Sequence, residues 1–331
     1  MLGEGLLLWY AQNGRSLPWR KDRDPYRVWV SETMLQQTRV EAVLPRYEAF
    51  LEALPTLHAL AAVPDEKLHK LWEGLGYYSR ARNLKRAAAA IEALGSFPRC
   101  HDELRKLPGF GPYTAGALCS IAFGQRRAAV DGNVLRIFSR LRAIEEAISL
   151  PSVRREAERF CLAEMPEGAD PGAFNQALMD LGALLCTPKS PRCGLCPIAA
   201  HCLALAGGEP ARYPRRAPRK ARAHESFDVY LFLRGGRALL RKRPDAGLLA
   251  SLWEFPHHLE QEPELLGEPL LSHRHLFTHR VWEMRFFLAK APKKTPEGCV
   301  WLSAEEILAL PMPSAMAPMR KAAVKALDLP I

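Results

Sequence analysis

The sequence of 331 residues lacks any apolar run long enough to cross a membrane. A spanning helix needs about 20 consecutive apolar residues, whereas the short apolar stretch Leu6–Tyr10 is followed at once by Gln12, Asn13 and Arg15. The chain also lacks the pattern of a signal peptide and any internal repeat. These absences argue against a membrane protein and a repeat array, and they predict a cytoplasmic protein.

Negative charge is in the minority. Lys and Arg number 46 against 36 Asp and Glu, which leaves a formal charge of +10. A basic protein favours a polyanionic partner, because each Lys or Arg that meets a phosphate releases condensed counterions. Basicity alone is weak evidence, since many basic proteins bind no nucleic acid. The charge therefore points toward DNA or RNA without identifying either.

The chain is long enough for two domains of ordinary size. In residues 1–205 apolar side chains recur at three and four positions, which predicts a mainly α-helical domain. Residues 206–224 form a basic linker, and its core, Arg212–Ala221, is punctuated by prolines. Such a linker either follows a phosphate backbone or is a solvated tether without a partner.

Residues 225–331 have a different pattern and predict an α+β domain. The segment Phe227–Arg241 alternates like paired strands around Gly235-Gly236, a turn that suits a tight hairpin. A further strand is expected at Val281–Ala289. Helices are expected at Ala304–Leu310 and Pro318–Leu327.

Four of the eight cysteines fall close together. Eight cysteines without secretory features indicate a reducing compartment, where clustered thiols are more often metal ligands than disulfides. Four nearby thiolates suit an iron–sulfur cluster, although structural zinc also accepts four. Because only one C-x2-C pair is present, the spacing favours iron–sulfur over zinc. The cluster cysteines are Cys186, Cys193, Cys196 and Cys202, whereas Cys100, Cys119, Cys161 and Cys299 are scattered and predicted to be buried in the core.

The segment Leu107–Gly116 predicts a helix, a glycine turn and a second helix. Gly109 and Gly111 would let backbone N–H groups point outward at the start of the second helix, which is a natural phosphate site. A plain connection between helices is the alternative. Asp131 then precedes another apolar helix, where an aspartate is ordinarily an N-cap.

Together these features resemble the endonuclease III, or helix-hairpin-helix, superfamily of DNA glycosylases. The resemblance implies a 4Fe-4S cluster on the cysteine loop, largely structural, which positions a basic loop on DNA. It implies that Asp131 faces the sugar of a flipped nucleotide, where a carboxylate stabilises oxocarbenium character. Members that also cleave the strand carry a lysine in the second hairpin helix. Tyr113 stands at that position, and Lys106 lies before the turn, so we expect no efficient lyase step.

The N-terminal motifs Leu17–Arg20, Pro25-Tyr26 and Trp29–Thr38 resemble the adenine DNA glycosylase (MutY) family, which removes adenine mispaired with 8-oxoguanine or guanine. The resemblance implies that Glu32 is the general acid that protonates adenine N7, with a pKa raised by apolar neighbours. It assigns the sugar's surroundings to Tyr113, and Asn133 would orient Asp131. The alternative for Glu32 is a solvated glutamate on a helix without a catalytic role.

Other positions carry over by motif. Trp19, Arg20 and Gln176 match residues that line the adenine pocket, Gln37 matches a side chain inserted in the space left by the flipped base, and Tyr77 matches one wedged beside the oxidised guanine. A wedge helps offset the loss of stacking, which is a few kcal/mol. Each aromatic could instead be core, and we expect core positions for Tyr78 and Trp72.

The segment Gly247–Pro256 resembles the start of a Nudix signature, but no glutamate-rich helix follows that would hold magnesium. This is similar to the degenerate Nudix-like domain of the same family, which recognises 8-oxoguanine through a Phe-Ser-His loop. Here the loop reads Phe277-Thr278-His279, so the geometry at 8-oxoguanine is altered by one methyl group. His273, His275 and His279 need no metal in this setting.

The resemblance predicts a monomeric, bacterial-type, nucleoid-associated enzyme that acts on double-stranded DNA and has no membrane partner. One rival is a thymine or oxidised-pyrimidine glycosylase of the same superfamily, which would generally lack the second domain. The other is a non-catalytic iron–sulfur protein that binds DNA or senses redox state, in which Glu32 and Asp131 would be dispensable.

Overall fold

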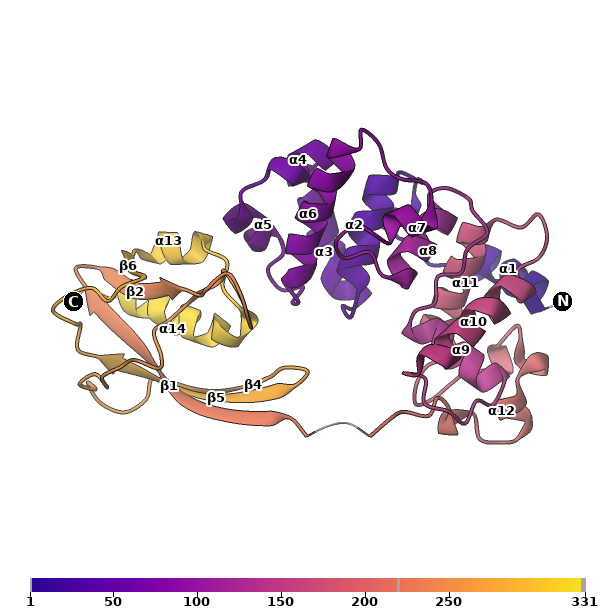
Figure 1. The fold of residues 1–331 in the computed structure, drawn as a ribbon. Coiled ribbons are helices and arrows are strands. Elements are labelled where there is room, and N and C mark those ends of the chain that lie inside the picture. Colours follow the sequence, from indigo (N-terminus) through magenta and orange to yellow (C-terminus); the bar gives the residue numbers. More distant parts are fainter. Residues whose placement is uncertain (1, 219–220, 329–331) are drawn as a thin grey trace. The chain divides into compact units, whose positions relative to one another are not determined.

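The computed structural model describes residues 2–218 and 221–328 (Figure 1). Positions 219–220 of the predicted linker and 329–331 of the predicted second domain lie outside the described residues. Two compact units are present. One comprises the chain up to Ala62 with Asn83–Pro218, and the other comprises Val63–Arg82 with the described residues after Pro218. Within the described residues, no helix is long and apolar enough to cross a membrane.

The first unit is helical, as the apolar spacing predicted. Helix α11 lies at its centre and packs against α1, α8 and α9, while α2 packs against α3 and α8. Because α11 is surrounded, even its polar residues Asn175 and Asp180 are fully buried. The helices of this unit are α1 (Leu2–Asn13), α2 (Pro25–Leu35), α3 (Val40–Ala53), α4 (Leu57–Ala62), α7 (His101–Leu104), α8 (Pro112–Ile121), α9 (Gly132–Leu141), α10 (Pro151–Glu164), α11 (Pro171–Leu184) and α12 (Leu203–Ala206), and α6 (Ser79–Ala93) belongs partly to each unit.

Several helices begin at an aspartate followed by proline or glycine. Asp24, Asp131 and Asp170 are the N-caps of α2, α9 and α11, and each side chain accepts backbone N–H groups of the first turn. These N–H groups have no partner inside the helix, so the carboxylate satisfies them and complements the positive end of the helix dipole. The local sequence therefore fixes where the helices that carry the predicted site begin.

The second unit holds a mixed sheet whose strand order is β3-β2-β1-β5-β4, with β6 paired to β2. The predicted hairpin is confirmed: Leu233 faces Ala238 across a turn in which Gly235 and Gly236 both have positive φ. Strand β5 is also confirmed, but its parallel pairing with β1 was not foreseen. The strands are β1 (Ala223–Arg234), β2 (Arg237–Lys242), β3 (Trp253–Glu254), β4 (Leu271–Leu276), β5 (Arg280–Ala289) and β6 (Cys299–Leu302).

Helices α13 (Ala304–Ala309) and α14 (Ala317–Leu327) confirm the two predicted near the C-terminus. Their apolar residues Ile307, Met319 and Ala323 share one core with Val229 and other buried residues of β1 and β5. One face of the sheet is therefore covered by helices. Helix α5 (Asp65–Leu71) also belongs to this unit.

The predicted linker begins as a fixed segment rather than a free tether. Tyr213 is buried and its hydroxyl donates to Glu145 at 2.7 Å, while Arg212 and Arg215 form ion pairs with the same carboxylate. Arg140 also donates from Nε to the Tyr213 carbonyl at 3.1 Å. The boundaries at 205 and 225 stay a proposal.

A buried carboxylate holds the start of the Nudix-like segment. Glu254 of β3 is 1% exposed and accepts from Arg241 Nε at 2.8 Å and from Arg243, with His257 3.0 Å away. Burial alone would raise the pKa of Glu254, but His257 and Arg243 outweigh it and lower the pKa to about 2. Glu254 is thus an ionised group that fixes β2 and β3 together.

We predict that Glu254→Gln lowers the free energy of unfolding by about 3 kcal/mol at neutral pH, because Arg241 and Arg243 lose their buried counter-charge but keep some contact with water. The folded-state pKa is depressed, so this stability is fully present above about pH 4.5 and is lost as the pH falls through about 2. Urea unfolding followed by circular dichroism at several pH values measures the difference.

The matched control is Asp228→Asn on β1, whose partner Arg285 is 61% exposed at its side chain. Exposed pairs contribute less than about 1 kcal/mol. An equal loss of unfolding free energy in the two variants would contradict the larger contribution that we assign to Glu254.

Candidate active site and cluster loop

Glu32 lies on α2 with 6% of its surface exposed, and Tyr113 of α8 donates a hydrogen bond from its hydroxyl to Glu32 Oε2. Burial is the largest influence and raises the pKa of Glu32, while the Tyr113 hydrogen bond and the charge of Arg20 oppose that rise. Burial likewise raises the pKa of Tyr113 well above its usual value, so its hydroxyl stays protonated. The solvated-glutamate alternative is wrong.

Asp131 caps α9 and accepts three hydrogen bonds. The donors are the backbone N–H groups of Asn133 at 2.9 Å and Val134 at 2.8 Å, and the Asn133 amide Nδ2 at 2.8 Å. Burial raises the pKa of Asp131, and these donors oppose the rise by favouring the carboxylate. The negative charge of Asp131 also raises the pKa of Glu32. The structure therefore brings Glu32, Tyr113 and Asp131 together, with Asn133 bonded to Asp131 as expected.

Arg20 and Gln176 lie in a polar network that sequence reasoning missed in part. Arg20 binds the buried carboxylate of Asp180, as does Arg15, and Gln176 accepts a hydrogen bond from the Tyr10 hydroxyl at 2.7 Å. Asp180 is a lone acidic residue in the apolar run 177–185, and that isolation was the available signal. Trp19 is 5% exposed and packs edge-on against Tyr47, so most of its ring belongs to the core.

Two predicted DNA-contacting side chains are exposed on strained backbone. Gln37 follows the end of α2 with φ 57°, and Tyr77 has φ 48° with 45% of its surface exposed. A positive φ is uncommon for residues other than glycine, and such positions cluster at functional sites. Trp72 and Tyr78 are buried, which confirms them as core residues.

The glycine turn before α8 has the predicted form. Gly109 has φ 79°, and a Cβ atom there would lie 3.0 Å from Asn83 Cβ, so a side chain would be doubly unfavourable. Gly111 is the N-cap of α8, with open space beside it. Because Pro112 at the first position of α8 has no N–H, the backbone N–H groups of Gly109 and Gly111 are the candidate donors to a phosphate.

The loop Phe277-Thr278-His279 connects β4 to β5 in the second unit and lines a cavity of about 410 Å³ together with Tyr77 and Arg82. Thr278 Oγ1 and the Tyr77 hydroxyl are 2.6 Å apart and share a hydrogen bond. Phe277 is half-buried against Trp282. The residues matched to recognition of oxidised guanine therefore lie in one place.

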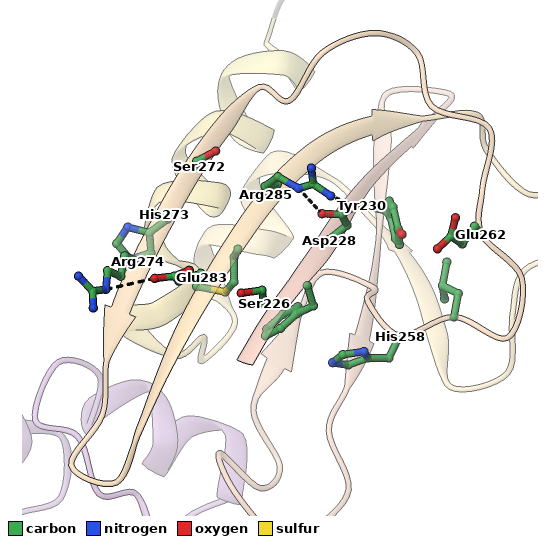
Figure 2. A pocket seen from close by; sticks show the side chains of 13 residues that line it. Ser226, Asp228, Tyr230, His258, Glu262, Ser272, His273, Arg274, Glu283 and Arg285 are labelled. Atoms are coloured by element: carbon green, nitrogen blue, oxygen red, sulfur yellow. Dashed lines mark hydrogen bonds and ion pairs between the residues drawn. The ribbon is translucent and has the colours of Figure 1, made fainter. Parts of the chain in front are cut away.

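A larger cavity of about 820 Å³ opens on the sheet beside the irregular segment that contains His258 and Glu262 (Figure 2). Its polar side chains pair across strands, Asp228 with Arg285 at 2.7 Å and Arg274 with Glu283 at 3.5 Å. Residues 255–270, where a Nudix hydrolase would place its metal-binding helix, form no helix. None of the predicted site residues lines this cavity.

The four clustered cysteines line one small cavity after α11, and none of them forms a disulfide. Arg140 of α9, which is 2% exposed, donates from Nη1 to Cys186 Sγ at 3.2 Å. Arg136, one turn earlier, donates from Nε to the Cys186 carbonyl at 2.7 Å and from Nη2 to Asn133 Oδ1 at 2.7 Å. These arginines were also missed from the sequence.

The donor set fits an iron–sulfur cluster. Four thiols around one cavity, with apolar Leu185 and Leu205 in its wall, match the softness and the burial that such a cluster requires. In the part of the chain that the structure describes, no three His, Cys, Asp or Glu side chains are placed to hold a single metal ion.

The scattered cysteines correct one prediction. Cys119 and Cys161 are buried, as expected, but Cys100 is exposed and Cys299 is only partly buried. Cys100 sits at the start of the four-residue helix α7, and Cys299 begins a strand paired only to β2, so neither position is enclosed.

Comparison with known proteins assigns the chain to a family. Three family models match the chain: HhH-GPD superfamily base excision DNA repair protein at residues 30–162, iron-sulfur binding domain of endonuclease III at residues 186–202, and NUDIX domain at residues 229–322. The human adenine DNA glycosylase is 35% identical, and the alignment covers 94% of this chain and 72% of that protein. The chain belongs to the adenine DNA glycosylase family.

Solved structures agree with this placement in the helical part. A thermostable thymine-DNA glycosylase matches with TM-score 0.57 and 27% identity, over 62% of this chain and 95% of that one. A non-covalent endonuclease III–DNA complex matches with TM-score 0.53 and 26% identity, over 62% of this chain and 94% of that one. The predicted fold class, a helical glycosylase domain followed by a Nudix-like domain, is confirmed.

As a member of the adenine DNA glycosylase family, the protein hydrolyses N-glycosyl bonds in base excision repair. Its predicted 4Fe-4S cofactor is confirmed by the match at residues 186–202, whose ends are Cys186 and Cys202. The role of each individual site residue remains a prediction.

We predict that Cys196→Ser lowers the iron and sulfide content of the purified enzyme and its visible cluster absorption, because the cluster needs a thiolate at each corner. The melting temperature should fall with it, since metal binding and folding are coupled. Elemental analysis, absorption spectra and thermal unfolding measure these effects. Cys100→Ser is the control, because Cys100 is exposed and outside the loop; equal iron content in the two variants would contradict the assignment.

Proposed function

We propose that the enzyme removes adenine opposite 8-oxoguanine or guanine by hydrolysis, and leaves an abasic site without cutting the strand. The observation that carries this proposal is the buried contact between Glu32 and Tyr113 next to the Asp131 carboxylate. This arrangement places a proton donor, Glu32, near the Asp131 carboxylate, which can stabilise a sugar cation.

Glu32 supplies the proton that the leaving base requires. A purine anion leaves poorly, so N7 of adenine must be protonated as the glycosidic bond breaks. The raised pKa of Glu32 keeps more of it protonated near neutral pH. Because the Tyr113 hydroxyl donates to Oε2, the proton for the base resides on Oε1.

Asp131 works in the opposite protonation state. Its three N–H donors favour the carboxylate, whereas Glu32 accepts a single O–H donor. Two carboxyl groups whose environments differ in this way can divide the roles of acid and anion. The Asp131 carboxylate then stabilises the oxocarbenium sugar or captures it covalently, and water completes the hydrolysis.

Tyr113 argues against strand cleavage. A lyase step needs an amine that attacks C1′ of the sugar, and Tyr113 stands where the resemblance places that lysine. Its hydroxyl is instead bonded to Glu32. Lys106 is exposed in the turn before Gly109.

The helical part presents the DNA-binding groups. Its likeness to endonuclease III in complex with DNA supports a duplex substrate. The backbone N–H groups of Gly109 and Gly111 would bind a phosphate, and Gln37 would enter the space left by the flipped adenine. The cluster held by Cys186, Cys193, Cys196 and Cys202 supplies rigidity to the loop beside α9 when bound.

The second unit recognises 8-oxoguanine in this proposal. Tyr77 and Thr278 share one hydrogen bond within one cavity that Phe277 and His279 also line. Thr278 keeps the hydroxyl expected of serine, and Tyr77 fixes its direction. We assign these four residues to the oxidised guanine.

The cellular setting is also part of the proposal. We propose that the enzyme acts on the chromosome as a monomer, with a cytoplasmic, nucleoid-associated location. We also keep the division into a glycosylase domain (1–205), a linker (206–224) and a recognition domain (225–331).

We predict rapid release of adenine from duplexes with adenine opposite 8-oxoguanine, slower release opposite guanine, and none of thymine opposite guanine. Strand breaks should appear only after alkali, because no amine attacks the sugar. Gel analysis of labelled duplexes, with and without alkali, measures both. Breaks without alkali at the rate of base release would contradict the inference from Tyr113 that the enzyme has no efficient lyase step. Rapid thymine release would favour the rival thymine glycosylase.

We predict that Glu32→Gln slows excision by about 100-fold or more while duplex binding persists, because proton transfer is lost. In wild type the rate should fall as the pH rises through the raised pKa of Glu32. Tyr113→Phe removes a hydrogen bond that lowers this pKa, so the fall should move to higher pH. Single-turnover rates across pH test this; an unchanged or lower midpoint in Tyr113→Phe would contradict it.

A further inference from the structure

Asp180 of α11 is a carboxylate with a fully buried side chain that two arginines bind at once. Arg15 donates to Oδ1 from Nε at 2.9 Å and Nη2 at 2.6 Å, and its backbone N–H donates to Oδ2 at 2.9 Å. Arg20 donates to Oδ2 from Nη1 at 2.8 Å and to Oδ1 from Nη2 at 2.9 Å. Every acceptor direction of Asp180 is therefore used to hold one loop.

The carboxyl group of Asp180 is held in its ionised form. Burial alone would raise the pKa of its carboxyl group, but the hydrogen bonds and charge of Arg20 and Arg15 outweigh burial and lower it. Buried ion pairs of this kind are weak sources of stability, because desolvation offsets most of the attraction. Their usual advantage is a fixed geometry, which directs attention to what Asp180 holds in place.

Arg20 is the part of this cluster that reaches the predicted adenine pocket. Its guanidinium lies 5.8 Å from the ring centroid of Tyr10, and the Tyr10 hydroxyl donates to Gln176 Oε1 at 2.7 Å. Gln176 and Asp180 are four residues apart on α11, so they lie on the same face of that helix. The contacts close a ring from Asp180 through Arg20 and Tyr10 back to α11.

The hydrogen bond from Tyr10 engages the oxygen end of the Gln176 amide. Because Oε1 accepts from Tyr10, the nitrogen Nε2 is the end left to donate. A ring nitrogen of adenine carries a lone pair that accepts such a donor. Rotation of the amide by half a turn would present an oxygen to that lone pair and oppose binding.

We propose that Asp180 and Tyr10 are positioning residues for the adenine pocket: Asp180 fixes Arg20, and Arg20 with Tyr10 orients the Gln176 amide so that Nε2 donates to the base. The inference rests on the proposed function, which places Arg20 and Gln176 against adenine. It adds two residues that the resemblance does not match to the adenine pocket.

The first test measures single-turnover excision of adenine opposite 8-oxoguanine, and affinity for the same duplex carrying an uncleavable adenosine analogue. Tyr10→Phe removes one hydroxyl group and should slow excision about 3- to 10-fold with little change in melting temperature. Asp180→Asn should slow it at least about tenfold, since a displaced pocket residue is costly to the rate. Duplex affinity should change less than the rate in both variants.

Asp170→Asn is the matched control on α11. Asp170 also pairs with an arginine, Arg23, but that pair is largely exposed and outside the ring. Asparagine caps a helix as well as aspartate does, so this variant should excise at about the wild-type rate. A loss of excision rate equal to that of Asp180→Asn would overturn the proposal, because the effect would then come from any ion pair on α11 and not from the ring.

The second test separates positioning from a general loss of structure. If Asp180 acts by placing Arg20, the double variant Asp180→Asn with Arg20→Met should be no slower than the slower single variant. Independent structural damage would instead multiply the two losses, and that result would overturn the proposal. If Asp180→Asn fails to fold, Tyr10→Phe decides, and a wild-type rate in that variant rejects the inference.

Wild type and Glu32→Gln, measured on the same duplex, distinguish failure of the proposed function from failure of the positioning inference. Absence of adenine release by wild type means that the proposed function has failed. Normal release by wild type, a strong loss in Glu32→Gln and wild-type rates in Tyr10→Phe and Asp180→Asn mean that only the positioning inference has failed.

Discussion

The helical unit depends on the hydrogen bonds that α9 makes along one side. Asp131 caps the helix, Arg136 and Arg140 follow one turn apart, and both arginines are buried while they donate to Cys186, through its carbonyl and its sulfur. Arg140 also donates to the Thr187 and Pro188 carbonyls at 2.8 and 2.9 Å. The buried guanidinium groups of α9 therefore have their partners in the loop, and the helix and the loop hold each other in place. The position of Asp131 is set by the same rigid helix.

The proposed site depends on two carboxyl groups, Glu32 and Asp131, that are buried in different ways. Burial raises the pKa of both Glu32 and Asp131, and the difference comes from their partners. Backbone N–H groups at a helix start are fixed donors with a favourable dipole, which stabilise a charge at Asp131. Glu32 sits within α2, where no free N–H groups exist, and its hydroxyl partner Tyr113 comes from another helix. Local backbone geometry thus gives the two carboxyl groups different hydrogen-bond donors.

Sequence reasoning identified the parts of the fold that short motifs encode. The hairpin at Gly235-Gly236, the N-cap at Asp131 and the glycine turn before α8 depend on residues close together in the chain, so their chemistry was visible. The parallel pairing of β1 with β5 and the ion pairs of Asp180 with Arg15 and Arg20 join residues 57 to 165 positions apart. No local pattern specifies such partners. Cys100 was misjudged because residue type predicts burial only on average.

The cysteine loop was the surest feature of the sequence, and the structure narrows what its cluster can do. The thiol groups surround their own cavity, which Glu32, Tyr113 and Asp131 do not line. The bonds that run from the loop toward the site start at the Cys186 carbonyl and pass through Arg136 to Asn133. These two hydrogen bonds link the position of the loop to that of Asn133. In the proposed mechanism the cluster therefore supports α9, and bond breaking is assigned to the carboxyl groups that α2 and α9 present.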